Sequence, residues 1–330
     1  MFHSKIVSTG SAFPKKRVTN DDIAKMVDTS DEWIVERTGI RARRIADVSK
    51  GECNTGFAFE AATAALAKAK MKASDLDLIV YCTVTPDRPL PSASCMLQDK
   101  LGAKNIPAFD VAAACSGFVF GLSIANSFIR SGQYKTVLVV GAEILSTYTN
   151  WTDRNLCVLF GDGAGCAILT RTEDEDESRV LSTHIHSDGS HQSLFFTEAG
   201  GSSKRIDAEV LKNGSHFMTM KGKEIFKEAV RTLADCAIEA IEANGFKPED
   251  IDWFIPHQAN NRIIEAVAKR LDFPLDKVIV NIDEYGNTSS ATVPTALDQA
   301  IADGRIKRGD LVLMGVFGAG LTYGSALIRW

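Results

Sequence analysis

The sequence lacks the long apolar run that a membrane-spanning helix requires. Such a helix needs about 20 apolar residues, whereas runs such as the one from Val137 to Val140 are short and are bounded by glycine or charged residues. The start of the chain, from Met1 to Lys5, has neither a basic leader with an apolar segment nor a small-residue cleavage site. We therefore expect no membrane partner, no secretory signal and a cytoplasmic location.

The sequence also lacks an excess of basic residues and a regular cysteine pattern. Its 37 Lys and Arg residues stand against 42 Asp and Glu residues, so net charge provides no attraction for nucleic acid, and an anionic partner would need a local basic patch. Seven cysteines, an odd number without CxxC spacing, argue against a disulfide framework and a cysteine zinc site. The histidines form no metal-binding array, although His184 and His186 would share one face of a strand, so we expect no metal and no cofactor.

What the sequence does have is an internal duplication. Residues 73–80 (ASDLDLIV) match residues 248–255 (PEDIDWFI), and residues 137–141 (VLVVG) match residues 311–315 (LVLMG). In the first pair, each copy follows an amphipathic helix, predicted over 59–69 and 229–244. The length exceeds that of a single hydrophobic core, so we predict two similar halves, 1–172 and 180–330. The acidic segment 171–179 between them is expected to be a solvated connector.

The alternation of buried strands with helices predicts an α/β fold. Strands rich in Val, Ile and Leu that alternate with helices of ten to fifteen residues indicate mostly parallel sheets covered by helices. Helices of the two copies end at 131–132 and 303–304, an offset of 172 that carries Cys115 onto Asn287. We expect these two strand-to-helix turns to face each other near a pseudo-two-fold axis, where a site between the halves could form.

Cys115 is the first candidate for chemistry. It is expected at the turn between a strand and a helix that runs to Arg130, among small residues that permit a sharp elbow. The N-terminus of a helix stabilises a thiolate relative to a thiol, which favours a nucleophile. The alternative is a small buried cysteine with a packing role only.

His257 and Asn287 are the polar candidates of the second half. His257 follows a buried strand, and the carboxyl ends of such strands are where ligands of α/β proteins gather, so it suits an acid, a base or a hydrogen-bond donor. Taken singly, His257 is equally compatible with a structural role, and Asn287 with a turn before a helix. The glycine clusters 161–165 and 318–320 lack the dinucleotide and P-loop patterns, so we expect close backbone approach there, with N–H groups that could bind an oxyanion.

Three spaced motifs resemble the β-ketoacyl-acyl-carrier-protein synthase III family of thiolase-fold condensing enzymes. They are AACSG at 113–117, HQAN at 257–260 and GNTS at 286–289. The segments 28–40, 160–165 and 324–330 extend the resemblance over essentially the whole chain. The resemblance implies a thiolase-like duplicated α-β-α-β-α five-layer sandwich with pseudo-two-fold symmetry, usually a homodimer.

The resemblance also implies a reaction in two stages that initiates fatty acid synthesis. Cys115 would take the acyl group of an acyl-CoA, usually acetyl-CoA, and malonyl-acyl-carrier protein would then lose carbon dioxide and attack the acyl-cysteine. His257 and Asn287 would donate hydrogen bonds to the enolate oxygen of the malonyl thioester. The backbone N–H groups of Cys115 and Ala319 would bind the oxyanion of the acyl-cysteine.

Further residues are assigned by the same resemblance. Adenine would stack between Trp33 and Arg154, and Leu90, where relatives often have Phe, would close the acyl pocket of the partner subunit and admit primers longer than acetyl. The surface residues Arg262, Lys269 and Arg270 would dock the acidic carrier protein, unless they form only a solvated face. The remaining CoA contacts would be Arg37, Thr38, Ala259 and Asn260.

Three alternatives stay open at this point. A specialised member of the same family, of the alkylquinolone-type or ester-forming kind, would share the nucleophile and use another acceptor. A cysteine hydrolase would use Cys115, His257 and Asn287 as nucleophile, base and orienting group. A non-enzymatic scaffold with relic motifs would need none of these residues.

Overall fold

The structure, a computed structural model, describes residues 2–172 and 177–330. Residues 173–176 of the expected connector lie outside the described residues, and strands reach into the 171–179 segment from both sides. Two mixed sheets form the framework, and strands between residues 3 and 172 build one of them, whereas strands between residues 179 and 329 build the other. Among the described residues, no helix is both long and apolar enough to cross a membrane.

The sheet of the first half has five strands. Its three strands β6, β4 and β5 are parallel, whereas β1, β7 and β6 are antiparallel neighbours. Every residue of β4 and β6 is buried, because helices cover both faces. In spatial order the strands are β1 (His3–Ala12), β7 (Asp162–Thr172), β6 (Thr136–Ile144), β4 (Leu78–Cys82) and β5 (Ala108–Val111).

The sheet of the second half has four strands and repeats part of this pattern. Strands β11 and β12 are parallel, and β12, β13 and β8 are antiparallel neighbours. In spatial order the strands are β11 (Trp253–Pro256), β12 (Leu311–Gly318), β13 (Thr322–Arg329) and β8 (Arg179–Ser187).

The prediction of mostly parallel sheets is wrong. Only the pairs β4–β5, β4–β6 and β11–β12 are parallel, and the other pairs of the two main sheets are antiparallel. Parallel neighbours need a crossover connection, usually a helix, whereas antiparallel neighbours need none. The connections from β6 to β7 and from β12 to β13 contain no crossover helix, so each returns antiparallel. Runs of buried Val, Ile and Leu cannot distinguish the two directions.

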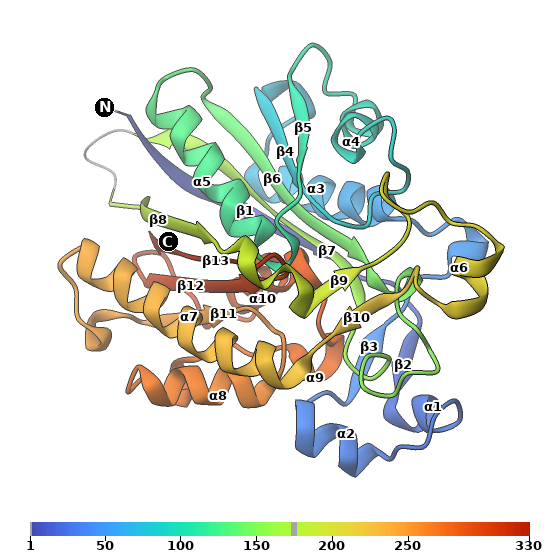
Figure 1. Ribbon diagram of the computed structural model, residues 1–330. Coiled ribbons are helices and arrows are strands. Elements are labelled where there is room, and N and C mark those ends of the chain that lie inside the picture. The colour runs from blue at the N-terminus through green and yellow to red at the C-terminus, as the bar shows by residue number, and fades with distance from the viewer. Residues whose placement is uncertain (1, 173–176) are drawn as a thin grey trace.

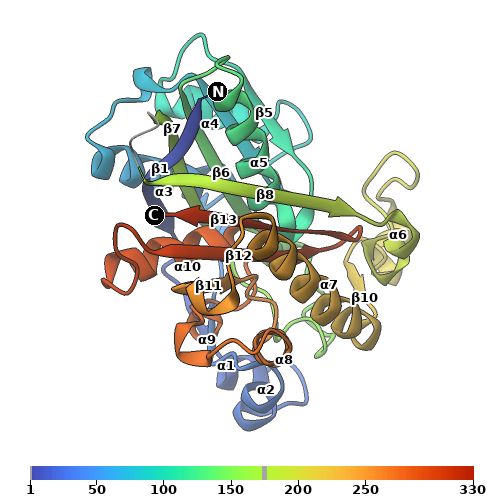
Figure 2. The ribbon, with the colours of Figure 1, turned by 90° about the vertical axis from the view of Figure 1, so that its left-hand side faces the viewer.

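The helices and sheets stack in five layers, as the thiolase-like resemblance predicts (Figures 1 and 2). The central layer packs against both sheets, and each sheet has a further pair of helices on its outer face. In each outer pair, one helix packs directly against the sheet. This helix carries buried alanines, such as Ala61 and Ala237, whose small side chains allow the helix to lie close to the sheet. The layers are α3 (Asn54–Ala69) with α4 (Ala93–Leu101), then α5 (Gly117–Arg130) with α10 (Thr292–Ala302) in the centre, and α7 (Gly222–Ala243) with α8 (Asn261–Arg270).

Shorter elements form an outlying unit and the rim of the site. Helix α2 (Asp31–Thr38) begins where the Ser30 hydroxyl accepts the N–H of Trp33 and ends at Gly39, which has a φ of 78°. The other short elements are β2 (Arg17–Thr19), α1 (Asn20–Ala24), β3 (Ala42–Arg44), β9 (Phe195–Thr197), α6 (Ala208–Asn213), β10 (Met218–Met220) and α9 (Ile282–Tyr285).

The duplication is visible in the central layer, but its register differs from the expected one. A single 3₁₀ turn precedes α5 at 114–116 and precedes α10 at 289–291, so the starts of both copies are related by an offset of 175. The offset of 172 holds only at the left-handed caps Gly132 and Gly304, because α10 is three residues shorter than α5. Cys115 therefore corresponds to Ser290, and the predicted correspondence with Asn287 is wrong.

Candidate active site

A cavity of about 490 Å³ opens between the two halves, and most of the predicted site residues line it. Its wall combines the elbow before α5, the end of β11, the turn before α10 and the rim helices α2 and α8. The predicted residues that line this cavity are Trp33, Arg37, Thr38, Cys115, His257, Ala259, Asn260, Arg262, Asn287 and Ala319.

Cys115 lies in a sharp turn between β5 and α5. Ala114, just before it, has a φ of 46°, a left-handed value that L-residues rarely adopt. Gly318 permits the elbow to approach β12 closely, because a Cβ atom at Gly318 would lie 2.8 Å from the backbone nitrogen of Cys115. The cysteine is only 6% exposed and lines the cavity. The expected elbow is thus present, and the strain is concentrated at the residue before the thiol.

The protonation of Cys115 differs from the expectation of a stabilised thiolate. The pKa of the Cys115 thiol is raised to about 12, mainly by burial and also by the nearby Glu143 carboxylate, although interaction with the Ser289 side chain lowers it. The thiol form therefore dominates at neutral pH. A nucleophilic Cys115 therefore needs a group that accepts its proton.

His257 follows β11 and is held from both sides. Its backbone N–H donates to the carbonyl oxygen of Gly315 (2.7 Å), and its ring Nδ1 lies 2.7 Å from the Thr292 hydroxyl oxygen. Thr292 also lies within hydrogen-bonding distance of the Ser289 carbonyl oxygen (2.9 Å), so its single hydroxyl hydrogen has two possible acceptors. Burial lowers the pKa of His257 to about 3, so the imidazole is neutral at pH 7.

Asn287 is oriented by its own turn. Its side-chain oxygen accepts the backbone N–H of Ser289 (2.8 Å), and its backbone N–H donates to the Leu159 carbonyl oxygen (2.9 Å). The side-chain NH₂ group is therefore the end that can donate to a bound group. The backbone oxygen of Asn287 accepts the N–H of Gly161 (3.0 Å), where the first half approaches closely, as expected for the glycine cluster.

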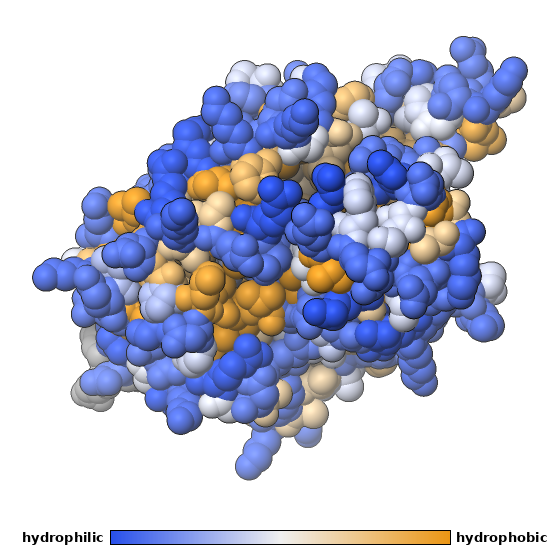
Figure 3. Space-filling view, turned by 90° about the horizontal axis from the view of Figure 1, so that it is seen from below, coloured by the Kyte–Doolittle hydropathy of each residue, from blue (hydrophilic) through white to orange (hydrophobic). Residues whose placement is uncertain are grey.

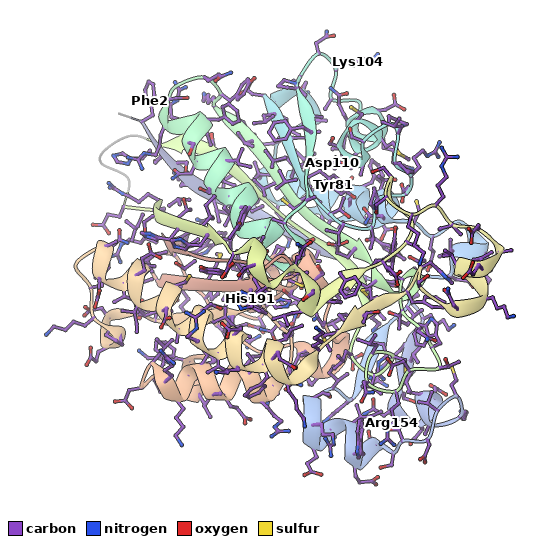
Figure 4. All side chains as sticks on the ribbon, viewed as in Figure 1. Phe2, Tyr81, Lys104, Asp110, Arg154 and His191 are labelled. Atoms are coloured by element: carbon purple, nitrogen blue, oxygen red, sulfur yellow. The ribbon has the colours of Figure 1, made fainter. Side chains whose placement is uncertain are left out.

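Aromatic and cationic groups gather at the rim of the cavity. The guanidinium of Arg37 lies 4.6 Å from the centroid of the Trp33 ring, and that of Arg154 lies 5.0 Å from it. Arg154 does not line the cavity itself, and it donates to the Asp28 carbonyl oxygen (2.8 Å) beside α2 (Figure 4). The Asn260 side chain caps α8 and donates to the Arg37 carbonyl oxygen (3.0 Å), which ties α8 to α2.

The remaining predicted residues are spread more widely. Arg262 lines the cavity, whereas Lys269 lies exposed at the far end of α8, and Arg270 forms an ion pair with Asp235 (3.0 Å). Ala319 lines the cavity and is not among the residues with positive φ. Leu90 lies outside the cavity, and its 83% exposure leaves it free to contact another molecule. The surface seen from below is mostly hydrophilic, with a hydrophobic strip near its centre (Figure 3).

Sequence reasoning missed three residues that surround the catalytic candidates. Ser289 and Thr292 contact Cys115 and His257, respectively, and Glu143 is a fully buried carboxylate behind Ser289. A signal for Glu143 was present, because an acidic residue within a continuous buried strand is rare unless it is paired or functional. Ser289 and Thr292 carried no such signal, since hydroxyl residues are common before helices.

Comparisons with known proteins give one result over the full chain. Family models described as 3-oxoacyl-[acyl-carrier-protein (ACP)] synthase III, and its C-terminal part, match residues 109–189 and 241–330. Beta-ketoacyl-[acyl-carrier-protein] synthase III of Xanthomonas campestris is 51% identical over 99% of this chain and 98% of its own length. The protein of that name from Caldanaerobacter subterraneus is 50% identical over 98% of this chain and 97% of its own length. The crystal structure of 3-oxoacyl-[acyl-carrier-protein] synthase III from Aquifex aeolicus superposes with a TM-score of 0.91 at 48% identity, covering 99% and 100% of the two chains.

Proposed function

The chain belongs to the 3-oxoacyl-[acyl-carrier-protein] synthase III family, and on this premise we propose that its cavity joins the acyl group of an acyl-CoA to malonyl-acyl-carrier protein. The reaction is a decarboxylative Claisen condensation through an acyl-cysteine, and it initiates fatty acid synthesis. The observation that carries the proposal is the convergence of Cys115, His257 and Asn287, from three separate segments, on one cavity.

In the first stage Cys115 attacks the thioester carbonyl of the acyl-CoA, and CoA leaves as its thiol. The tetrahedral intermediate carries a negative oxygen, which the backbone N–H groups of Cys115 and Ala319 stabilise. This role is compatible with Ala319 because its backbone does not need the positive φ that favours glycine. Acetyl-CoA is the proposed primer.

In the second stage malonyl-acyl-carrier protein replaces CoA and loses carbon dioxide. The charge that develops on its thioester oxygen is stabilised by a ring N–H of His257 and the side-chain NH₂ of Asn287. A donor at Nε2 of neutral His257 requires Nδ1 to accept, so the Thr292 hydroxyl hydrogen must point to Nδ1 rather than to the Ser289 carbonyl oxygen. The carbanion then attacks the acyl-cysteine and releases the β-ketoacyl product.

The proposed substrate contacts run from residues beside the rim into the cavity. Trp33 and Arg154 stack on adenine, with Arg37 and Thr38 beside them, since planar guanidinium groups and indole rings suit a purine. Ala259 and Asn260 line the path of the pantetheine arm. Arg262, Lys269 and Arg270 dock the carrier protein, and of these Arg262 lies nearest the opening because it lines the cavity.

We further propose a cytoplasmic homodimer in which Leu90 of each subunit closes the acyl pocket of the other. The exposure of this leucine on a surface loop supports a contact with a partner. Leucine is smaller than the phenylalanine that relatives often have there, so primers longer than acetyl are expected to load. No cofactor is required by the chemistry proposed for Cys115, His257 and Asn287.

The hydrogen bonds around His257 favour condensation over hydrolysis. A cysteine hydrolase would need Asn287 to orient His257. Instead, Nδ1 of His257 contacts Thr292, and the side-chain oxygen of Asn287 accepts the Ser289 N–H. The two side chains are thus held independently, as suits two donors that act on one substrate oxygen.

The proposal is tested by intact-mass measurement after incubation with acyl-CoAs from acetyl to octanoyl, with the adduct located by peptide mapping. We expect an acyl group on Cys115 that persists until malonyl-acyl-carrier protein is added and then leaves as a β-ketoacyl product. Loss of the adduct to water alone would contradict the proposal and support the hydrolase. A Cys115→Ala variant provides the matched control without a nucleophile.

A further inference from the structure

A fully buried carboxylate, Glu143, lies at the carboxyl end of β6 behind the catalytic turn. From its own half it accepts the backbone N–H of Val84 (3.2 Å) and the hydroxyl of Thr85 (2.5 Å). From the other half it accepts the hydroxyls of Ser289 and Ser290 (each 3.1 Å). A buried acid that joins the two halves at this point, and that the proposed reaction does not use, requires an explanation.

Ser289 connects this carboxylate to the nucleophile. Its hydroxyl donates to Oε1 of Glu143 (3.1 Å), and its turn at 289–291 packs against the turn at 114–116, where the Ser289 side chain also interacts with the Cys115 thiol. Its backbone has a φ of 53°, a left-handed conformation that serine rarely adopts. Such strain persists where the surrounding structure holds it, and here it accompanies the hydrogen bond from the Ser289 hydroxyl to Glu143.

The charges around Glu143 allow its carboxylate to gain a proton near neutral pH. Burial raises its pKa to about 7, although the hydroxyls of Thr85, Ser289 and Ser290 lower the pKa. The titratable groups that interact electrostatically with Glu143 are Tyr81 and Cys82 on β4 and Cys115 on the elbow. Burial raises the pKa of each of these three groups, so they are neutral at pH 7.

We propose that Ser289 is a further catalytic residue that passes the proton of the Cys115 thiol to Glu143 when Cys115 attacks an acyl donor. Glu143 is then a positioning residue that acts through Ser289, because it holds the hydroxyl and takes its proton. The inference rests on the proposed function, since acyl-CoA is the donor.

The first stage neither gains nor loses a proton overall. Ser289 takes the proton of Sγ and gives its own to Oε1 of Glu143, while the sulfur lone pair forms the new C–S bond. When the C–S bond to CoA breaks, the CoA thiolate takes a proton back from Glu143 through Ser289. Cys115 has then gained the acyl group, CoA has become a thiol, and Glu143 is again a carboxylate, so one negative charge is shared throughout.

The test uses iodoacetamide, which alkylates a thiolate and needs no acyl-CoA, so it does not depend on the proposed function. The alkylation rate of Cys115 is measured by peptide mapping from pH 6 to pH 9, with the exposed Cys95 as an internal reference. In the unmodified protein we expect the rate to rise up to about pH 7 and then to level off, because the carboxylate that accepts the thiol proton is then fully formed. In Glu143→Gln the rate should rise about tenfold per pH unit through this range, without levelling.

The two serines provide a matched pair of variants. Ser289→Ala should react about tenfold more slowly, since a hydrogen bond to a charged group is lost. Ser325→Ala should keep the unmodified profile, because the buried Ser325 hydroxyl donates to the Cys236 carbonyl oxygen (2.7 Å) and does not line the cavity. A Glu143→Gln profile that still levels off near pH 7, or a Ser289→Ala rate equal to the unmodified one, overturns the proposal. If Glu143→Gln fails to fold, the Ser289→Ala comparison decides.

The acyl-loading rate with acetyl-CoA is measured on the same variants by quenched-flow mass spectrometry. It should fall in Ser289→Ala and Glu143→Gln and stay unchanged in Ser325→Ala. Absence of loading in every protein, together with the expected alkylation profiles, would reject the acyl donor and leave the proton path supported. Loading that is unchanged in Ser289→Ala would reject the proton path and leave the acyl donor supported.

Discussion

Burial shifts the pKa values of two residues in this cavity in opposite directions. Burial raises the pKa of Cys115 and lowers the pKa of His257, so both side chains are neutral in the resting cavity. A neutral His257 suits a hydrogen-bond donor, whereas a neutral Cys115 must lose a proton before it attacks. The same desolvation therefore favours the second stage of the reaction and opposes the first.

Replacing Cys115 and His257 should separate the two stages. Cys115→Ser should abolish acyl loading, because a serine hydroxyl at this position has no comparable tendency to ionise. His257→Ala should still load the acyl group but lose decarboxylation of malonyl-acyl-carrier protein by about 10²-fold or more, as loss of an oxyanion donor costs in general. Intact mass reports loading, and carbon dioxide release reports the second stage. A His257→Ala protein that cannot load would contradict the assigned role.

The lowered pKa of His257 predicts loss of stability in acid. The folded state holds His257 neutral down to about pH 3, whereas the unfolded chain binds a proton near pH 6.5. Between these values the unfolded state binds more protons, so His257 makes the free energy of unfolding fall by about 1.4 kcal/mol per pH unit as the pH is lowered below 6.5. Urea unfolding of His257→Gln should show a weaker acid dependence than the unmodified protein.

A histidine outside the cavity provides the control for this measurement. His216→Gln leaves His257 in place and should retain the acid dependence of the unmodified protein. Equal slopes for His257→Gln and the unmodified protein between pH 6.5 and pH 4 would show that His257 is not buried in its neutral form.

At the scale of elements, the helices α2 and α8 form the rim of the cavity. Helix α2 presents Trp33 at the rim, and α8 is tied to it through Asn260. The sequence predicted the ends of α3 and α7 closely, at 69 and 244 against the observed 69 and 243, because their apolar residues follow the helical period. The three-residue difference between α5 and α10 could not be predicted, since it changes no periodicity and shows only when both ends are located.

Helix α2 should contribute affinity for CoA rather than catalytic rate. Trp33→Ala should raise KM for acetyl-CoA about tenfold, in line with about 1–3 kcal/mol for stacking of a base on an aromatic ring, and should leave kcat within about twofold. The matched measurement uses acetyl-pantetheine, which lacks the adenine. With this donor, Trp33→Ala and the unmodified protein should have the same KM, and a rise with both donors would contradict adenine stacking.

At the scale of the whole molecule, the halves are joined by a buried acid on α10. Asp298 accepts the hydroxyls of Thr9 and Ser11 on β1 (each 2.7 Å) and pairs with Lys68 on α3 (2.5 Å). These contacts span more than 200 residues of sequence, and they fix the central layer against the first sheet. The relative position of Cys115 and His257 depends on such contacts, because the two residues belong to different halves.

Removing this acid should destabilise the entire protein. Asp298→Ala leaves the buried hydroxyl of Thr9 without its acceptor, so we expect a loss of about 2–4 kcal/mol in the free energy of unfolding, measured with urea. Asp303→Ala, at the C-cap of the same helix, is the control, since the Asp303 carboxylate pairs with Arg305 at the surface and its loss should cost less than about 1 kcal/mol. Equal losses of unfolding free energy for both variants would show that Asp298 does not stabilise the contact between the two halves.

The repeated segments at 73–80 and 248–255 were sufficient to predict two similar halves and a layered α/β fold, because duplication and periodicity are properties of the chain. Strand direction was not predictable, since it depends on connections such as the one from β12 to β13 that leave no hydrophobic pattern. The motifs around Cys115, His257 and Asn287 identified residues that meet in one cavity. Glu143 and Ser289 meet Cys115 only through tertiary contacts, which a single sequence does not display.

The separation of the rim residues from the buried sulfur affects which thioesters can serve as acyl donors. Trp33 and Arg37 lie at the opening, and Cys115 lies almost fully buried at the other end. A carrier that contacts Trp33 and Arg37 while its acyl group reaches the sulfur gains binding energy away from the reacting bond. Thioesters on a short carrier lack these contacts at the rim, so we expect them to be poor donors even when their acyl group is the right one.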